Sequence, residues 1–92
     1  MYRIAFTNKM KRDVKLARKR GKDLNKLTNV LELLASGSPI PQKYRDHRLS
    51  GSLKDFRELH IEPDWLLLYY VQDDALVLTA TGTGTHADLF GE

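Results

Sequence analysis

Residues 60–71 read HIEPDWLLLYYV, and the fold can be built outward from this stretch. Trp65 to Val71 is a seven-residue run with no charged side chain, as expected for a central strand buried on both faces of a sheet. Glu62-Pro63-Asp64, just before it, has the composition of a tight turn. The run is the longest apolar stretch of the chain, and it is far shorter than the roughly 20 residues that cross a membrane.

A further strand is expected on each side of this central strand. The preceding one covers about Leu53 to Ile61, where apolar and polar residues alternate poorly. Asp73-Asp74 turns the chain after the central strand, and Ala75 to Thr81 forms the next strand. Three consecutive strands joined by tight turns predict an antiparallel meander. The remaining residues, 82–90, are expected to close with a short helical turn.

The first part of the chain predicts one strand and two helices. Alternating apolar residues from Tyr2 to Phe6 indicate the strand, and Thr7 or Asn8 supplies an oxygen that caps the following helix. That helix ends near Gly21, and a second one runs from Asp23 to Ser36. Each helix is apolar on one side only, so both should lie on the same face of the sheet.

These elements give an α+β fold in the order βααβββ, with a small antiparallel-type sheet and a two-helix hairpin packed on one face. We predict a single domain over residues 1–92. A chain of this length buries only roughly 60–65% of the surface that its unfolded form exposes. A shallow site on the sheet surface is therefore easier to build than a deep pocket.

The composition excludes several classes of chemistry. The chain has no cysteine, which removes disulfides, thiolate metal sites and cysteine nucleophiles together. No apolar run of signal-peptide length follows the N-terminus, so we expect a cytoplasmic protein with no membrane partner.

The formal net charge of +3 is unevenly distributed. Residues 9–22 carry eight basic side chains and one acidic one, Asp13. Such a patch is the usual footprint of a polyanion-binding surface, although a solvated helix face has the same composition. The expected phosphate-contacting residues are Lys9, Lys11, Arg12, Lys15, Arg18, Lys19, Arg20 and Lys22.

The three histidines lie in the second half, each near a turn or chain end. His60 and Asp64 flank the predicted turn, and two antiparallel strands then return the chain to the same end of the sheet, where His86 follows. The topology therefore brings these three residues within reach of one another. His47 lies in a long loop that begins near Ser38, and this argument does not fix its position.

Imidazoles beside a carboxylate suit general acid–base work near neutral pH. Cleavage of RNA needs a base for the 2′-hydroxyl, an acid for the departing 5′-oxygen and a cation for the phosphoryl charge. Trp65 and Phe90 could stack on bases. Each residue also has a plainer interpretation, because a lone histidine is more often structural than catalytic, Trp65 could be core and Phe90 could pin the C-terminus.

A zinc site built from the histidines and Asp64 would be chemically possible. Their spacing matches no compact ligand motif, so we predict no metal and no cofactor.

Several stretches together resemble the YafQ branch of the RelE/ParE toxin superfamily. They are residues 13–17 with the basic residues after them, the loop YRDHRLSGS at 44–52, the turn HIEPDW at 60–65 and the ending TGTHADLF at 83–90. The similarity covers nearly the whole chain, and the order of elements agrees with the one predicted above.

The resemblance implies a RelE-like fold and a ribosome-dependent mRNA endonuclease, or mRNA interferase. It implies that His47, His60, Asp64 and His86 form the acid–base set, with His86 as general acid and Asp64 or His60 as base. Trp65 and Phe90 match positions that shape or stack on the substrate. The expected partners are a DinJ-type antitoxin, the 70S ribosome and its mRNA, with operator DNA reached only through the antitoxin complex.

One position departs from the family pattern. Toxins of this type usually carry arginine four residues before the C-terminal histidine, where this chain has Gly82. Loss of one preorganised cation commonly costs on the order of a hundred- to a thousandfold in rate. We therefore expect a weakened or inactive toxin, unless Arg48 or Arg57 reaches the phosphate instead.

Two other functions remain open at this point. A ParE-like inhibitor of DNA gyrase is disfavoured because that branch lacks the histidine set. A non-catalytic RNA-binding module would use the basic helix alone.

Overall fold

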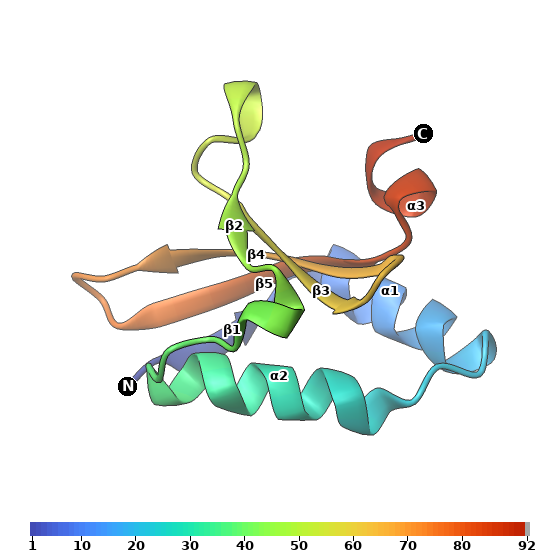
Figure 1. The fold of residues 1–92 in the computed structure, drawn as a ribbon, viewed down its shortest axis with the longest axis horizontal. Coiled ribbons are helices and arrows are strands. Elements are labelled where there is room, and N and C mark those ends of the chain that lie inside the picture. Colours follow the sequence, from blue (N-terminus) through green and yellow to red (C-terminus); the bar gives the residue numbers. More distant parts are fainter. Residues whose placement is uncertain (92) are drawn as a thin grey trace.

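The computed structural model describes residues 1–91 and confirms the predicted βααβββ order (Figure 1). The elements are β1 (Arg3–Phe6), α1 (Asn8–Lys19), α2 (Leu24–Ser36), the 3-10 helix η1 (Gln42–Tyr44), β2 (His47–Arg48), the 3-10 helix η2 (Gly51–Leu53), β3 (Arg57–Glu62), β4 (Trp65–Gln72), β5 (Val77–Gly84) and α3 (His86–Phe90). The two-residue strand β2 lies within the long loop, where no strand was predicted.

The strands form one sheet in the order β1-β5-β4-β3-β2. The pairs β2–β3, β3–β4 and β4–β5 are antiparallel, as the predicted meander requires, but β1 pairs with β5 in parallel. The sheet is therefore mixed, and the expectation of an antiparallel-type sheet was incomplete. The meander leaves the edge of β5 unpaired, and β1 takes that edge with Arg3 opposite Val77 and Phe6 opposite Ala80.

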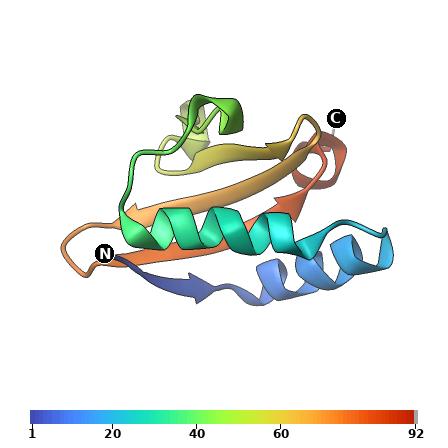
Figure 2. The same cartoon turned by 60° about the horizontal axis from the view of Figure 1, so that its bottom comes forward.

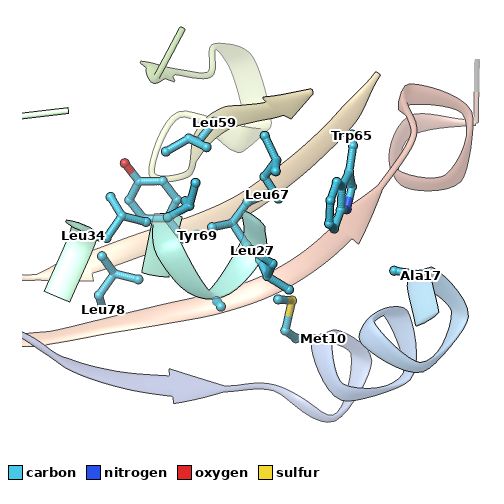
Figure 3. Close-up of a cluster of buried hydrophobic side chains, with 12 residues drawn as sticks. Met10, Ala17, Leu27, Leu34, Leu59, Trp65, Leu67, Tyr69 and Leu78 are labelled. Atoms are coloured by element: carbon cyan, nitrogen blue, oxygen red, sulfur yellow. The ribbon is translucent and has the colours of Figure 1, made fainter. Parts of the chain in front are cut away.

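Both long helices cover the same face of the sheet, as predicted (Figure 2). Met10 and Ala17 of α1 and three residues of α2 meet alternate residues of the strands in one buried cluster. The strand side of this cluster includes Leu59, Trp65 and Leu67, which are at most 1% exposed (Figure 3). Burial of apolar side chains on this face supplies most of the driving force for folding.

The helix boundaries follow from local capping. The Thr7 hydroxyl accepts the Met10 amide at the start of α1, and the Asp23 carboxylate accepts the Asn25 amide at the start of α2. Gly37 ends α2 with φ 74°, a left-handed conformation that favours glycine. Thr85 and Asp88 form a reciprocal capping box that begins α3.

The strand boundaries were predicted less well than the helices. The segment from Leu53 to Phe56 is not part of β3, because η2 and a turn occupy it. The chain turns between Asp73 and Leu76, so β5 starts at Val77 and continues to Gly84, three residues beyond the predicted end. Among residues 1–91, no helix has the length and apolar character needed to span a membrane.

Candidate active site on the open face of the sheet

The predicted histidines gather on the face of the sheet that α1 and α2 leave open. In Figure 1, the loop that follows β2 and the helix α3 rise above the sheet, while α1 and α2 lie below it. Glu58 and His60 of β3 alternate with the core residues Leu59 and Ile61, so their side chains point to this open face. His47 pairs directly with Glu58 across the β2–β3 ladder and therefore shares the same face.

The side chains of His47, His60, His86 and Phe90 form a row. The ring centroids of His47 and His60 are 5.9 Å apart, those of His60 and His86 are 5.8 Å apart, and those of His86 and Phe90 are 6.3 Å apart. Residues that are separated by up to 43 positions in the chain thus lie side by side, as the hairpin argument required for His60 and His86.

Asp64 fixes the position of His86. The Asp64 Oδ1 atom accepts the His86 backbone N–H at 2.9 Å and lies 2.7 Å from its ring Nδ1. The backbone bond and then the ring bond hold the pKa of Asp64 below its usual range, so this carboxylate stays ionised where imidazoles titrate. Because a carboxylate only accepts, Nδ1 carries a proton and Nε2 is the His86 atom left to exchange one.

Glu58 was not predicted, yet it lies between two of the histidines. Its Oε1 atom is 3.0 Å from His60 Nε2 and 3.4 Å from His47 Nε2. The Glu58 and His60 residues are each 5% exposed. We call His47, Glu58 and His60 the imidazole–glutamate cluster. The signal that could have identified Glu58 is its spacing of two residues from His60 in a strand, which places both on one face.

Backbone carbonyls determine which ring nitrogen of His47 and of His60 faces Glu58. His47 Nδ1 lies 2.7 Å from the Arg45 carbonyl and His60 Nδ1 lies 3.4 Å from the Pro63 carbonyl, so each Nδ1 donates. Both Nε2 atoms then face an acceptor oxygen of Glu58. The His60 Nε2 atom is buried and has no hydrogen bond of good geometry despite its short distance to Glu58. The Nε2 atoms of the two imidazoles and the Glu58 carboxylate are therefore the atoms of this cluster that can exchange a proton.

The same cluster has the geometry of a metal site. One ligand atom from each of His47, Glu58 and His60 lies within 4.8 Å of the others. Two imidazoles and a carboxylate suit zinc or copper. This set differs from the one considered in the sequence, because it includes Glu58 and omits Asp64 and His86.

Trp65 does not lie on the open face. It is 1% exposed in the core cluster, and its indole N–H donates to Thr83 Oγ1 at 2.9 Å. The sequence left open whether Trp65 stacks on a base or belongs to the core, and its burial favours the core interpretation. Phe90 lies beside His86, where a base could reach its ring.

Arg48 and Arg57 also face away from the site. They pair with each other across the β2–β3 ladder, one residue along from His47 and Glu58, and so point to the opposite face. The Arg57 guanidinium contacts Asp46 at 3.2 Å and 3.3 Å, and Tyr69 donates to the same carboxylate at 2.5 Å. The expectation that either arginine reaches the phosphate has no geometric support.

The predicted phosphate-contacting residues divide into two groups. Lys9 pairs with Asp13 at 2.6 Å, Arg20 with Asp88 at 2.5 Å and Lys22 with Glu62 at 3.0 Å. The others are exposed, and none has a carboxylate within ion-pair distance in residues 1–91. They are Lys11, Arg12, Lys15, Arg18 and Lys19.

Comparison with known proteins identifies the family. Residues 2–91 match the family model described as "Bacterial toxin of type II toxin-antitoxin system, YafQ". The mRNA interferase toxin YafQ of Escherichia coli K12 is 47% identical over 89 residues, which cover 96% of this chain and 95% of that protein. This chain therefore belongs to the YafQ family of toxins of type II toxin–antitoxin systems.

Solved structures agree with this assignment. YafQ in the crystal structure of the E. coli DinJ–YafQ complex is 44% identical, with a TM-score of 0.90 over 99% of this chain and 100% of that one. A metal-bound toxin from Helicobacter pylori is 41% identical, with a TM-score of 0.92 over 98% of this chain and all of that one.

The pair of Arg20 and Asp88 should control how firmly α3 presents His86. The Arg20 side chain and then the Thr85 amide hold the pKa of Asp88 well below its usual range. The lowered pKa means that the contact is present at neutral pH and is lost only in strong acid, as Asp88 becomes protonated. We predict that Arg20→Ala raises the Asp88 pKa toward its ordinary value and speeds hydrogen exchange of the Leu89 and Gly91 amides.

The matched control is Arg18→Ala, which removes the same charge two residues away, at a position with no ion pair to Asp88 among residues 1–91. Equal exchange rates in wild type and Arg20→Ala, measured by NMR, would show that this ion pair does not hold the helix.

Proposed function

We propose that this toxin is an endoribonuclease that cleaves mRNA on the ribosome by acid–base catalysis. The observation that supports this most directly is the row of imidazoles flanked by Glu58 and Asp64 on an open sheet face. The mRNA interferase activity named for the E. coli relatives favours the same reaction. An open face suits an extended RNA strand, which an enclosed pocket would not admit.

In the proposed reaction the 2′-oxygen of one nucleotide attacks the adjacent phosphorus. The imidazole–glutamate cluster accepts the 2′-hydroxyl proton, because His60 Nε2 is buried without a hydrogen-bond partner and lies 3.0 Å from Glu58 Oε1. The bond from phosphorus to the 5′-oxygen breaks, and His86 Nε2 donates a proton to that oxygen. The products are a 2′,3′-cyclic phosphate and a 5′-hydroxyl end. A proton on His86 would be stabilised by the Asp64 carboxylate.

This assignment refines the roles expected from the resemblance. Asp64 already accepts two hydrogen bonds from His86, so we assign it to positioning and charge stabilisation instead of proton removal. The base is placed in the cluster of His60 with Glu58. Phe90, beside His86, would stack on a base next to the scissile bond.

The partners follow from the family and from the charge distribution. The E. coli relative forms a complex with the antitoxin DinJ, and we propose a DinJ-type antitoxin for this chain. The exposed cations of α1 would contact ribosomal RNA phosphates, where each neutralised phosphate releases counterions. Binding to operator DNA would occur through the antitoxin.

We predict that His86→Ala lowers the rate of mRNA cleavage in the presence of ribosomes by about 10²- to 10⁴-fold, which is the usual contribution of a general acid. Asp64→Asn should lower the cleavage rate by less, because an amide oxygen can still hold the His86 ring in place but carries no negative charge. Primer extension on an mRNA with and without ribosomes measures both, and circular dichroism checks the fold.

Two outcomes would support other functions. Unchanged RNA activity in His86→Ala would indicate a binding module that uses the basic helix alone. Inhibition of DNA supercoiling in place of translation would indicate a gyrase inhibitor.

We further propose that a divalent metal inhibits this reaction, a possibility raised by the metal-bound toxin from H. pylori. Its ligands here would be His47, Glu58 and His60, whose lone pairs the proton transfer also needs. We predict that Zn²⁺ binds with a single site in calorimetry and slows cleavage. His60→Ala should weaken binding at least about tenfold, as loss of even an outer partner can.

The control is His86→Ala, which leaves all three proposed ligands in place and should bind Zn²⁺ like wild type. Equal Zn²⁺ affinity in wild type and His60→Ala would exclude this site.

A further inference from the structure

A lysine from α1 lies over the glycine that replaces the expected arginine. An ideal Cβ atom built on Gly82 would be 3.1 Å from Lys9 Nζ, 3.2 Å from Asp13 Oδ2 and 3.3 Å from Leu89 Cδ2. Gly82 is buried although it lies on the open side of the sheet. Its φ angle is not positive, so the backbone does not require glycine there. The missing side chain therefore leaves room, and Lys9 occupies it.

Strand register places Lys9 across from the acid–base groups. His47 pairs with Glu58, Glu58 with Leu68 and Leu68 with Gly82, and we call these four residues on four strands the cross-strand line. Residues that lie directly opposite one another point to the same face of the sheet. The cross-strand line therefore starts at the imidazole–glutamate cluster and ends under Lys9. Glu58 and Gly82 are two strand spacings apart, or about 9.6 Å, with the apolar Leu68 between them. Leu68 is only partly buried and separates the two ends of this line.

Asp13 holds the Lys9 ammonium in this place. Its Oδ2 atom accepts Lys9 Nζ at 2.6 Å and also the Thr83 backbone N–H at 3.1 Å. The second bond ties α1 to β5, so the lysine is anchored to the same strand that carries Gly82. The Lys9 side chain remains 53% exposed, and an ammonium has three N–H donors, of which Asp13 takes one. The other donors are available to a ligand on the open face.

We propose that Lys9 contacts the scissile phosphate of the RNA and stabilises its charge in the place of an arginine at position 82. The Lys9 ammonium is largely exposed, so its ion pair with Asp13 contributes little to stability, which agrees with a role in binding. This inference rests on the proposed function, since it names a substrate contact for that reaction.

A side chain at position 82 would overlap with the Lys9 ammonium, and this overlap leads to a specific expectation about Gly82→Arg. The new side chain would have to displace the Lys9 ammonium, so the two cations should substitute for each other and not add. Gly82→Arg alone should leave the cleavage rate within about threefold of wild type. Lys9→Ala should lower it on the order of a hundredfold, which is the usual cost of one preorganised donor. The double variant Lys9→Ala/Gly82→Arg should recover most of the loss, and Lys9→Arg should retain activity.

The matched control is Arg3→Ala. Arg3 is an exposed cation that pairs with Val77, five residues before Gly82 along β5. Arg3→Ala should cleave like wild type. A Lys9→Ala variant that also cleaves like wild type would overturn the inference while leaving the endonuclease itself intact.

A binding measurement separates this inference from the proposed reaction. The probe is a short single-stranded RNA with 2′-O-methyl groups, which cannot be cleaved by 2′-oxygen attack. Loss of one phosphate contact should reduce the slope of log affinity against log salt concentration by about 0.7 in Lys9→Ala, and Arg3→Ala should keep the wild-type slope. An unchanged slope in Lys9→Ala would overturn the assignment. A reduced slope in a protein that cleaves no mRNA would uphold the Lys9 contact and reject the proposed reaction.

Discussion

The bond between Asp64 and His86 connects the parts of the molecule on which the site depends. Asp64 belongs to the turn that joins β3 and β4, and His86 begins the helix that follows β5. One carboxylate oxygen accepts both the backbone N–H and the ring N–H of His86, which fixes the start of α3 and the orientation of the imidazole together. Arg20 and Asp88 hold the same short helix from the side of α1. These contacts are needed because α3 has only five residues, none of which is buried.

The two faces of the sheet divide stability and chemistry between them. The face that α1 and α2 cover holds the apolar core. This core includes Trp65, which the sequence had suggested as a substrate contact. The open face holds the imidazole–glutamate cluster, whose buried and incompletely satisfied His60 costs stability that a purely structural residue would not. Such a cost is common at functional sites, where charged groups are kept ready for reaction. Lys9 and Asp13 extend this face to the edge of β5.

The fold and part of the site could be predicted from local patterns. Turn composition around Pro63 and the lengths of the following strands were enough to bring His60, Asp64 and His86 together, because a hairpin returns the chain to its starting end. Glu58 was missed because β3 alternates poorly in the sequence, and its carboxylate becomes notable only between two imidazoles. Strand register decides the face of the sheet to which Trp65, Arg48 and Arg57 point, and the sequence left this register undetermined. The parallel pairing of β1 and the reach of Lys9 over Gly82 depend on contacts between distant segments, so no local pattern could show them.

The central claim is that Asp64 holds the Nδ1–H form of His86 and leaves Nε2 free for proton transfer. The most direct test is a long-range ¹H–¹⁵N correlation spectrum of the histidine rings at mildly alkaline pH, where imidazoles are neutral. The account predicts that His86 shows a protonated Nδ1 and an unprotonated Nε2, and that Asp64→Ala converts it to a mixture of the two forms. A protonated Nε2 in the wild-type protein, or a spectrum unchanged by Asp64→Ala, would contradict it.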